Sequence, residues 1–358
     1  MVEMRFIIAI VFILFTYLYL DCFQGDVLAV AQYVLSEGKT TYSYVLAPVL
    51  LTLVLFLLQV GVCTLTQVKR RFHALTYFPS MLMLTVLTDI PVDFDKHHGL
   101  GAWWWIIPLL LAVWGAGMWV ARQVEPFESL PHREGWLTKL TWQNLLQLLV
   151  MMLLTILVAN NDRVFHERMK MERLMKEGKY AQALQVGYKS QDVDSSLTML
   201  RMACLHRCGS MGEHLFEYPL MGGSKAMIPD GVTVKAMMWQ TPRWMKQNKG
   251  GKAKLRMPKD YLLCGLLLDK KLDRFVAEVK RTYIADSIPL PKHYKEALVL
   301  YAHRRTHPMV VYHDDVMDAD FQDYQALEHK HADAMQTQAA LRDTYGNTYW
   351  YYYQYGNR

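Results

Sequence analysis

The last 200 residues of this 358-residue chain lack any long apolar run, whereas the first 160 residues contain five apolar segments that are almost free of charge. Runs of about 18 or more such residues can cross a hydrocarbon core of about 30 Å as helices. The five segments are Phe6 to Leu20, Val45 to Leu65, Leu75 to Ile90, Leu100 to Ala121 and Trp142 to Val158. We therefore expect an all-α protein in which a polytopic membrane bundle of about five spans, residues 1–159, precedes a soluble domain, residues 160–358.

Cysteine is scarce, and the five cysteines have neither an even number nor the spacing of zinc ligands. They are expected to be free thiols rather than a disulfide framework. A glycine-rich nucleotide loop, a nucleophile elbow and an HExxH pattern are also missing from the sequence. The sequence therefore predicts no catalytic residue and no cofactor, and it favours a protein that is not an enzyme.

Acidic residues and histidines cluster twice, in residues 93–98 and 313–320. Carboxylate and imidazole groups are suitable ligands for divalent metals. Neither spacing matches a known site, however, and Lys96 opposes cation binding in the first cluster. The aspartates of the second cluster suit the N-terminus of a helix. We predict no metal site in either cluster.

Basic residues in the short loops predict the orientation of the bundle. Lys69, Arg70 and Arg71 lie between the second and third apolar segments, and the loop between the fourth and fifth holds further basic residues. The other loops carry mainly aspartate and glutamate. Because basic loops remain in the cytoplasm, we expect a bacterial inner-membrane protein with a cytoplasmic N-terminus. Five crossings would then place the C-terminal domain in the periplasm.

A cleaved signal peptide is an alternative interpretation of the first apolar segment. Arg5 precedes the segment, and Ala29-Val30-Ala31 resembles a cleavage site. The intervening stretch is long for a signal peptide and contains two aspartates, so we favour an uncleaved membrane helix. Cleavage would leave the C-terminal domain on the same side of the membrane.

The pattern after residue 160 is helical and lacks the alternation that marks strands. Residues Gly178 to Leu184 closely resemble the turn and the second-helix start of a tetratricopeptide repeat. Helix pairs of this kind have one apolar face each, which they bury by stacking on their neighbours. We expect an irregular tetratricopeptide-like α-solenoid, with the aromatic tail from Tyr349 to Tyr355 packed on its own domain.

The most unusual local feature of the soluble half is a basic stretch, Lys235 to Lys259, which contains no acidic residue. Basic side chains interleaved with tryptophan suit an anionic membrane surface. The candidate contacts with lipid headgroups or another anion are Trp239, Arg243, Trp244, Lys246, Lys249 and Lys252. The alternative is a solvated loop whose tryptophans pack on neighbouring helices. Nucleic acid is not an expected partner, because the periplasm offers little of it.

Three segments of the soluble half carry a resemblance to a family. They are Leu200 to Pro219 with its Cys208-Gly209 break, Leu290 to Leu298, and Tyr345 to Tyr353. Their order resembles an uncharacterised family of membrane proteins from gut Bacteroidota, a domain of unknown function with N-terminal transmembrane helices and a tetratricopeptide-like C-terminal region. The resemblance implies the architecture only, and no functional residue is carried over from it.

The function expected from these features is that of a membrane-anchored scaffold, which presents a periplasmic surface to a protein or another envelope component. One alternative is a subunit, catalytic or not, in envelope lipid or glycan metabolism. A cluster of ionisable residues in one pocket near the outer interface would favour it. A transporter component is the second alternative. Gln59 is the only strongly polar residue deep in a span, and no span has an ionisable residue at its centre, which disfavours transport.

Overall fold

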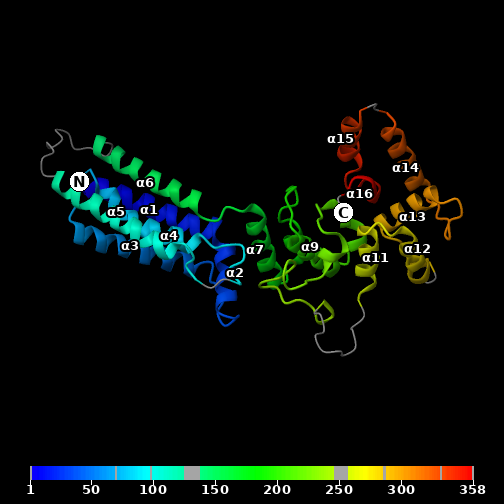
Figure 1. Ribbon diagram of the computed structural model, residues 1–358, viewed down its shortest axis with the longest axis horizontal. Coiled ribbons are helices and arrows are strands. Elements are labelled where there is room, and N and C mark those ends of the chain that lie inside the picture. The colour runs from blue at the N-terminus through cyan, green and yellow to red at the C-terminus, as the bar shows by residue number, and fades with distance from the viewer. Residues whose placement is uncertain are drawn as a thin grey trace. The chain divides into compact units, whose positions relative to one another are not determined.

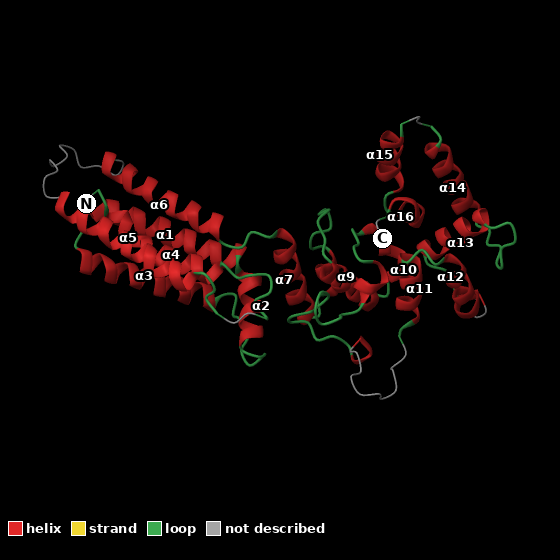
Figure 2. Ribbon diagram, in the orientation of Figure 1, coloured by secondary structure: helices red, strands yellow, loops and turns green. Residues whose placement is uncertain are grey.

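The computed structural model describes residues 2–68, 71–96, 99–124, 138–245, 257–284, 288–330 and 333–356, and these contain helices but no strands (Figures 1 and 2). Their contacts divide the chain into two compact units, Met1–His166 and Glu167–Arg358. The all-α class predicted from the sequence is confirmed. All five cysteines are free thiols, as expected.

The first unit is a bundle of helices (Figure 1). Its helices are α1 (Val2–Leu18), α2 (Gly25–Leu35), α3 (Leu46–Thr66), α4 (Phe78–Thr88), α5 (Trp103–Val124) and α6 (Lys139–Val158). A π-helical turn, Tyr19–Phe23, continues α1, and a 3-10 turn, His73–Tyr77, leads directly into α4. The shared core includes Ile8, Phe12, Leu55, Leu84 and Leu148.

Four helical stretches of this unit are long and apolar enough to cross a membrane. They are Glu3–Phe23, Leu46–Thr66, Trp103–Val124 and Lys139–Val158. At most 33% of the apolar part of any of these helices is buried inside the protein. Many leucines are exposed, such as Leu157 at 73% exposure. Apolar side chains exposed over a surface this large mark contact with lipid rather than with water. The first unit therefore associates with a membrane.

The predicted third span, Leu75 to Ile90, is shorter than expected. Its α-helix has only 11 residues, because Pro79 lies in the first helical turn and the chain leaves the helix at Asp89. Proline is favoured in the first turn of a helix, because a backbone N–H at that position would have no hydrogen-bond partner within the helix. Pro79 therefore marks the start of the helix, and the described residues contain four, not five, apolar helices of full spanning length.

The segment from Ala74 to Ile90, which contains α4, nevertheless extends along most of α6. Three hydrogen bonds join the two segments at a constant separation of 70 residues: Ala74 to Asn144 (2.7 Å), Thr85 to Thr155 (3.0 Å) and Ile90 to Asn160 (2.6 Å). A constant separation means that the two segments run parallel and in register. From residue 74 to residue 90 the rise is about 24 Å at about 1.5 Å per residue. The short helix and its flanking residues thus cover nearly the length of a membrane crossing.

Buried polar side chains also join α4 to α3. The side-chain amide of Gln59 donates to the hydroxyl of Thr76 at 3.1 Å, and the hydroxyl of Ser80 donates to the carbonyl oxygen of Leu55 at 2.8 Å. Such bonds between helices hold membrane bundles together, because lipid supplies no alternative partner. Gln59 therefore has a structural partner rather than a place on an open polar path.

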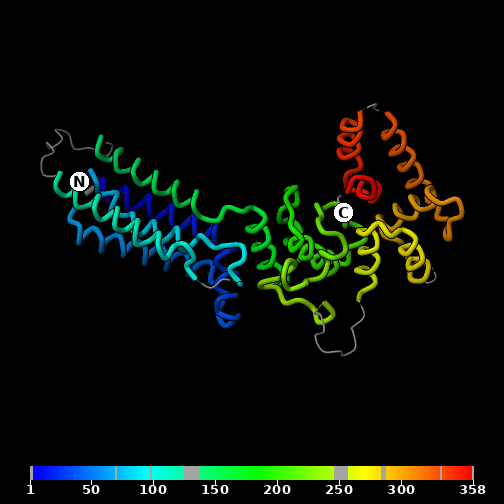
Figure 3. Tube along the Cα trace, viewed as in Figure 1, coloured from blue at the N-terminus to red at the C-terminus, as the bar shows by residue number. Residues whose placement is uncertain are grey.

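The second unit begins within α7 (Arg163–Lys176), and Figure 3 traces the succession of helices that follow it. These are α8 (Tyr180–Leu184), α9 (Ser195–Arg207), α10 (Met211–His214), α11 (Lys259–Leu268), α12 (Leu272–Val279), α13 (Lys292–Arg304), α14 (Asp315–Glu328), α15 (Ala334–Tyr345) and α16 (Tyr349–Tyr355). Gly178 turns the chain between α7 and α8 with a φ of 78°, a conformation that favours glycine.

Consecutive helices from α11 to α16 contact one another, and α16 also returns to α13. The side-chain carboxylate of Glu296 on α13 accepts a hydrogen bond from the backbone N–H of Tyr349 at 2.7 Å. The backbone carbonyl oxygen of Glu296 accepts a second one from the Trp350 indole at 2.8 Å. Both aromatic residues are buried, so the tail packs on its own unit as predicted. This return contact departs from a simple linear stack, and the tetratricopeptide-like solenoid stays a prediction.

Candidate functional site

Three of the six candidate contact residues in the basic stretch lie among the described residues. Trp239 is buried at 6% exposure, Arg243 is exposed, and Trp244 is partly covered. Lys246, Lys249 and Lys252 lie outside the described residues. Contact between this stretch and a membrane surface therefore stays a prediction, and of the described residues Arg243 is the best placed to make it.

A buried carboxylate holds the segment that contains Trp239. Glu172 on α7 accepts hydrogen bonds from the backbone amides of residues 237–239, and its carboxylate lies 3.7 Å from the guanidinium of Arg168. Arg168 also donates to the carbonyl oxygen of Lys235 at 2.9 Å. Burial raises the pKa of Glu172, whereas Arg168 and the three amides oppose that shift. The arrangement turns Trp239 into the core of the unit.

Trp244 packs on two neighbouring aromatic rings. Its ring centre lies 4.6 Å from that of Tyr261 and 6.1 Å from that of His206, and the last two rings are 5.1 Å apart. Burial lowers the pKa of His206, which favours the neutral imidazole at pH 7. Both tryptophans therefore contact helices of their own unit, an arrangement that fits the alternative left open by the sequence.

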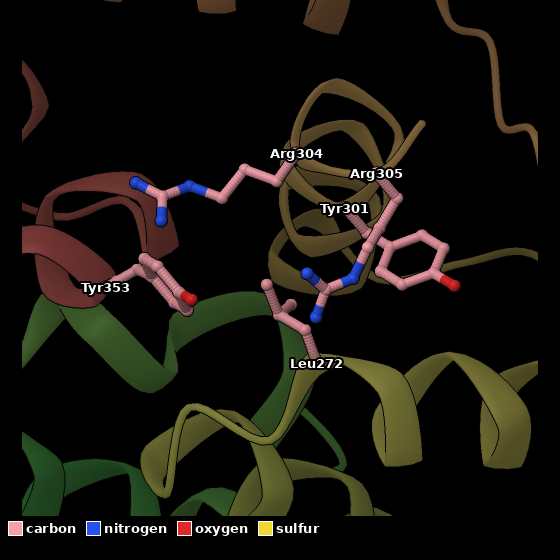
Figure 4. A pocket seen from close by; sticks show the side chains of 5 residues that line it. All are labelled: Leu272, Tyr301, Arg304, Arg305 and Tyr353. Atoms are coloured by element: carbon pink, nitrogen blue, oxygen red, sulfur yellow. The ribbon is translucent and has the colours of Figure 1, made fainter. Parts of the chain in front are cut away.

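A cavity of about 200 Å³ lies between α12, α13 and α16, at the surface of the second unit (Figure 4). It is lined by Leu272, Tyr301, Arg304, Arg305 and Tyr353. We call it the arginine–tyrosine pocket. Figure 4 shows Arg304 reaching across towards Tyr353, while Arg305 turns towards Leu272. Of these residues only Tyr353, in the aromatic tail, lies in a segment that the sequence pointed to, and none was predicted to form a site.

The two arginines of the arginine–tyrosine pocket have different surroundings. Arg305 makes a two-point contact with Asp273, at 3.0 and 2.6 Å, which lowers the pKa of that carboxyl and keeps the pair charged. The guanidinium of Arg304 instead lies 4.8 Å above the ring of Tyr353. Lys270 adds another positive charge 5.9 Å from the same ring. Asp273 offsets one of these charges, so the pocket has an excess of positive charge.

This geometry suits recognition of an anion. A guanidinium stacked on an aromatic ring keeps its N–H groups at its edge, where they can bind a carboxylate or phosphate at two points. The described residues of the lining include tyrosine hydroxyls but no carboxyl, imidazole or thiol group. Within the described parts of the chain, no three His, Cys, Asp or Glu side chains gather as metal ligands.

Residues 251–356, which include the arginine–tyrosine pocket, match the model of a family of unknown function (DUF6057). The match covers under a third of the chain and fits the uncharacterised domain expected from the sequence. No curated protein and no solved structure matches the chain.

Proposed function

We propose that this protein is a membrane-anchored scaffold whose helical second unit binds an acidic group of an envelope component in the arginine–tyrosine pocket. The proposal rests on the position of the Arg304 guanidinium over the ring of Tyr353. The neighbouring Arg305 is already paired with the carboxylate of Asp273. A cavity of about 200 Å³ admits one carboxylate or phosphate group rather than a whole molecule. The surrounding helix faces would then contact the rest of the partner.

The proposed topology places this pocket in the periplasm of a bacterial cell. The register of α4 with α6 supports five crossings, made by α1, α3, α4, α5 and α6. An odd number of crossings puts the two ends of the bundle on opposite sides. Because the basic loops favour a cytoplasmic N-terminus, the second unit would face outward, where acidic glycans, lipids and proteins of the envelope are available.

An enzymatic role in envelope lipid or glycan metabolism has less support. It requires ionisable groups that can donate and accept protons within one pocket near the outer interface. The described lining of the arginine–tyrosine pocket offers two arginines, two tyrosine hydroxyls and an apolar leucine, without a carboxyl or imidazole group. The side chains of Gln59, Ser80, Thr85 and Thr155, on α3, α4 and α6, bond to a neighbouring hydroxyl or to the backbone, and they provide no support for a transporter.

Affinity purification of the tagged full-length protein from envelopes in mild detergent tests the proposal. The wild type should retain a component that carries carboxylate or phosphate groups. The Arg304→Gln variant should retain at most about a tenth as much, because a hydrogen bond to a charged group contributes about 1.5–3 kcal/mol. Arg281→Gln, which removes an exposed arginine paired with Glu278, is the matched control. Equal retention by wild type and Arg304→Gln would refute the role of the pocket.

A further inference from the structure

The first unit contains a larger cavity, of about 470 Å³, that the proposed function does not use. One face of α2 forms a wall through Leu28, Ala31 and Leu35, which follow one another at helical spacing. The end of α4 and the chain after it form the opposite wall, which includes Leu87 and Ile90. Its volume falls within the range of about 300–1,000 Å³ typical of small-molecule sites. We call it the α2 pocket.

Among the described residues in the wall of the α2 pocket, the polar side chains are bonded to protein, with one exception. Gln32 donates to Thr40 at 3.1 Å, and Asp89 accepts a hydrogen bond from the Trp103 indole at 2.7 Å. The hydroxyl of Tyr42 is buried and has no hydrogen-bond partner among the described residues. A buried hydroxyl without a partner is unfavourable unless a ligand or water completes it. The α2 pocket thus offers an apolar volume and one unused hydrogen-bond donor.

We propose that the α2 pocket binds an acyl chain of a phospholipid from the surrounding bilayer, with the Tyr42 hydroxyl donating to the ester carbonyl. The pocket belongs to the unit that associates with a membrane, so the lipids of the bilayer are the nearest source of apolar ligands. Leu35 and Leu100, which also line the pocket, are 61% and 50% exposed, and hydrocarbon suits such residues better than water. The volume is about three times that of the apolar cavity of about 150 Å³ that takes up benzene.

Photolabelling of the purified full-length protein tests this proposal. The protein is delipidated in mild detergent and titrated with a phosphatidylethanolamine that carries a diazirine in one acyl chain. Mass spectrometry of the peptides then locates the label. We expect saturable labelling of residues 28–35 and 86–91, which unlabelled phosphatidylethanolamine competes away. Three results would overturn the proposal. They are labelling that does not saturate, labelling that is lost when more detergent is added without competing lipid, and equally strong labelling on the outer face of α3.

Two variants separate the pocket from the general lipid surface. The Leu35→Trp/Leu100→Trp double variant fills the exposed side of the α2 pocket and should reduce saturable labelling at least about fivefold. Tyr42→Phe keeps the ring but removes the donor, and it should weaken apparent affinity about twofold to tenfold. Leu57→Trp, at a 58% exposed position on α3, is the control and should have no effect. If the double variant is not monodisperse, Tyr42→Phe decides, and unchanged affinity in that variant contradicts the role of Tyr42.

Discussion

A hydrogen bond of 3.0 Å joins the hydroxyl groups of Thr85 on α4 and Thr155 on α6, and both side chains are buried in the first unit. It is the middle one of the three bonds that keep the two segments in parallel register. A short helix that ended halfway through the bundle would not maintain this register at both of its ends. The contact therefore supports counting α4 as a crossing, on which the proposed side of the second unit depends.

Asn144→Ala should destabilise the first unit. The side-chain oxygen of Asn144 accepts a hydrogen bond from the buried backbone N–H of Ala74 at 2.7 Å, and alanine would leave that donor without a partner. We expect a loss of about 1–2 kcal/mol, visible as a lower thermal unfolding midpoint in detergent. Gln143→Ala, one position away on α6, is the control. Equal midpoints for the two variants would show that the α4–α6 bond contributes little.

Glu172→Ala should release the segment around Trp239. The substitution leaves three backbone amides without their acceptor and removes the carboxylate that lies 3.7 Å from the Arg168 guanidinium, which costs about 3–5 kcal/mol for a buried charged pair. Limited proteolysis of the full-length protein should then show new cleavage within residues 237–245. Glu177→Ala removes a carboxylate at the surface end of the same helix and should leave the cleavage pattern unchanged. Protection of residues 237–245 in Glu172→Ala would contradict the account of this segment.

The stability of the second unit should fall with acidification below about pH 6.5, in part through His206. Burial lowers the pKa of His206 in the folded state, although Asp260 opposes the shift. A lowered folded-state pKa means that stability is fully present above the unfolded pKa and is lost as the pH falls towards the folded pKa. His206→Phe keeps a ring against Trp244 and Tyr261. Its unfolding midpoint should therefore fall less than that of the wild type between pH 7.5 and 5.5, and an equal fall would exclude a contribution from His206.

The basic stretch should bind anionic membranes through its basic side chains. A domain of residues 160–358 should bind anionic vesicles at low salt and dissociate as salt rises. Each basic residue near such a surface contributes about 1 kcal/mol, so replacing Arg243, Lys246, Lys249 and Lys252 with glutamine should abolish binding without changing helicity. The control, with the same change in net charge, replaces Lys170, Lys176, Lys271 and Lys330. Absence of binding by the wild-type domain at low salt would identify the stretch as a solvated loop.

The hydropathy pattern predicted the all-α class and four of the long apolar helices. It did not predict the length of α4, because hydropathy does not show that the chain takes a 3-10 turn at His73–Tyr77 before Pro79 starts the helix. A pattern of apolar residues reports which segments are buried, but not where a helix begins. The boundaries of the third segment were therefore the weakest part of the prediction.

The arginine–tyrosine pocket could not be predicted, because its residues meet only through tertiary contacts. Arg304 and Tyr353 come together because α16 returns to α13, where the buried Glu296 holds the backbone of Tyr349. A glutamate in a helix is usually assigned to the solvent face. The pair of adjacent arginines at the end of α13 and the aromatic tail were visible in the sequence, but nothing indicated that they touch.

The location of the second unit tests the central claim most directly. An alkaline phosphatase fused after Arg358 folds into an active enzyme only in the periplasm, and a fusion after Val124, at the predicted cytoplasmic end of α5, is the internal control. We predict an active fusion after Arg358 and an inactive fusion after Val124. An inactive fusion after Arg358 at normal expression would contradict five crossings and place the arginine–tyrosine pocket in the cytoplasm.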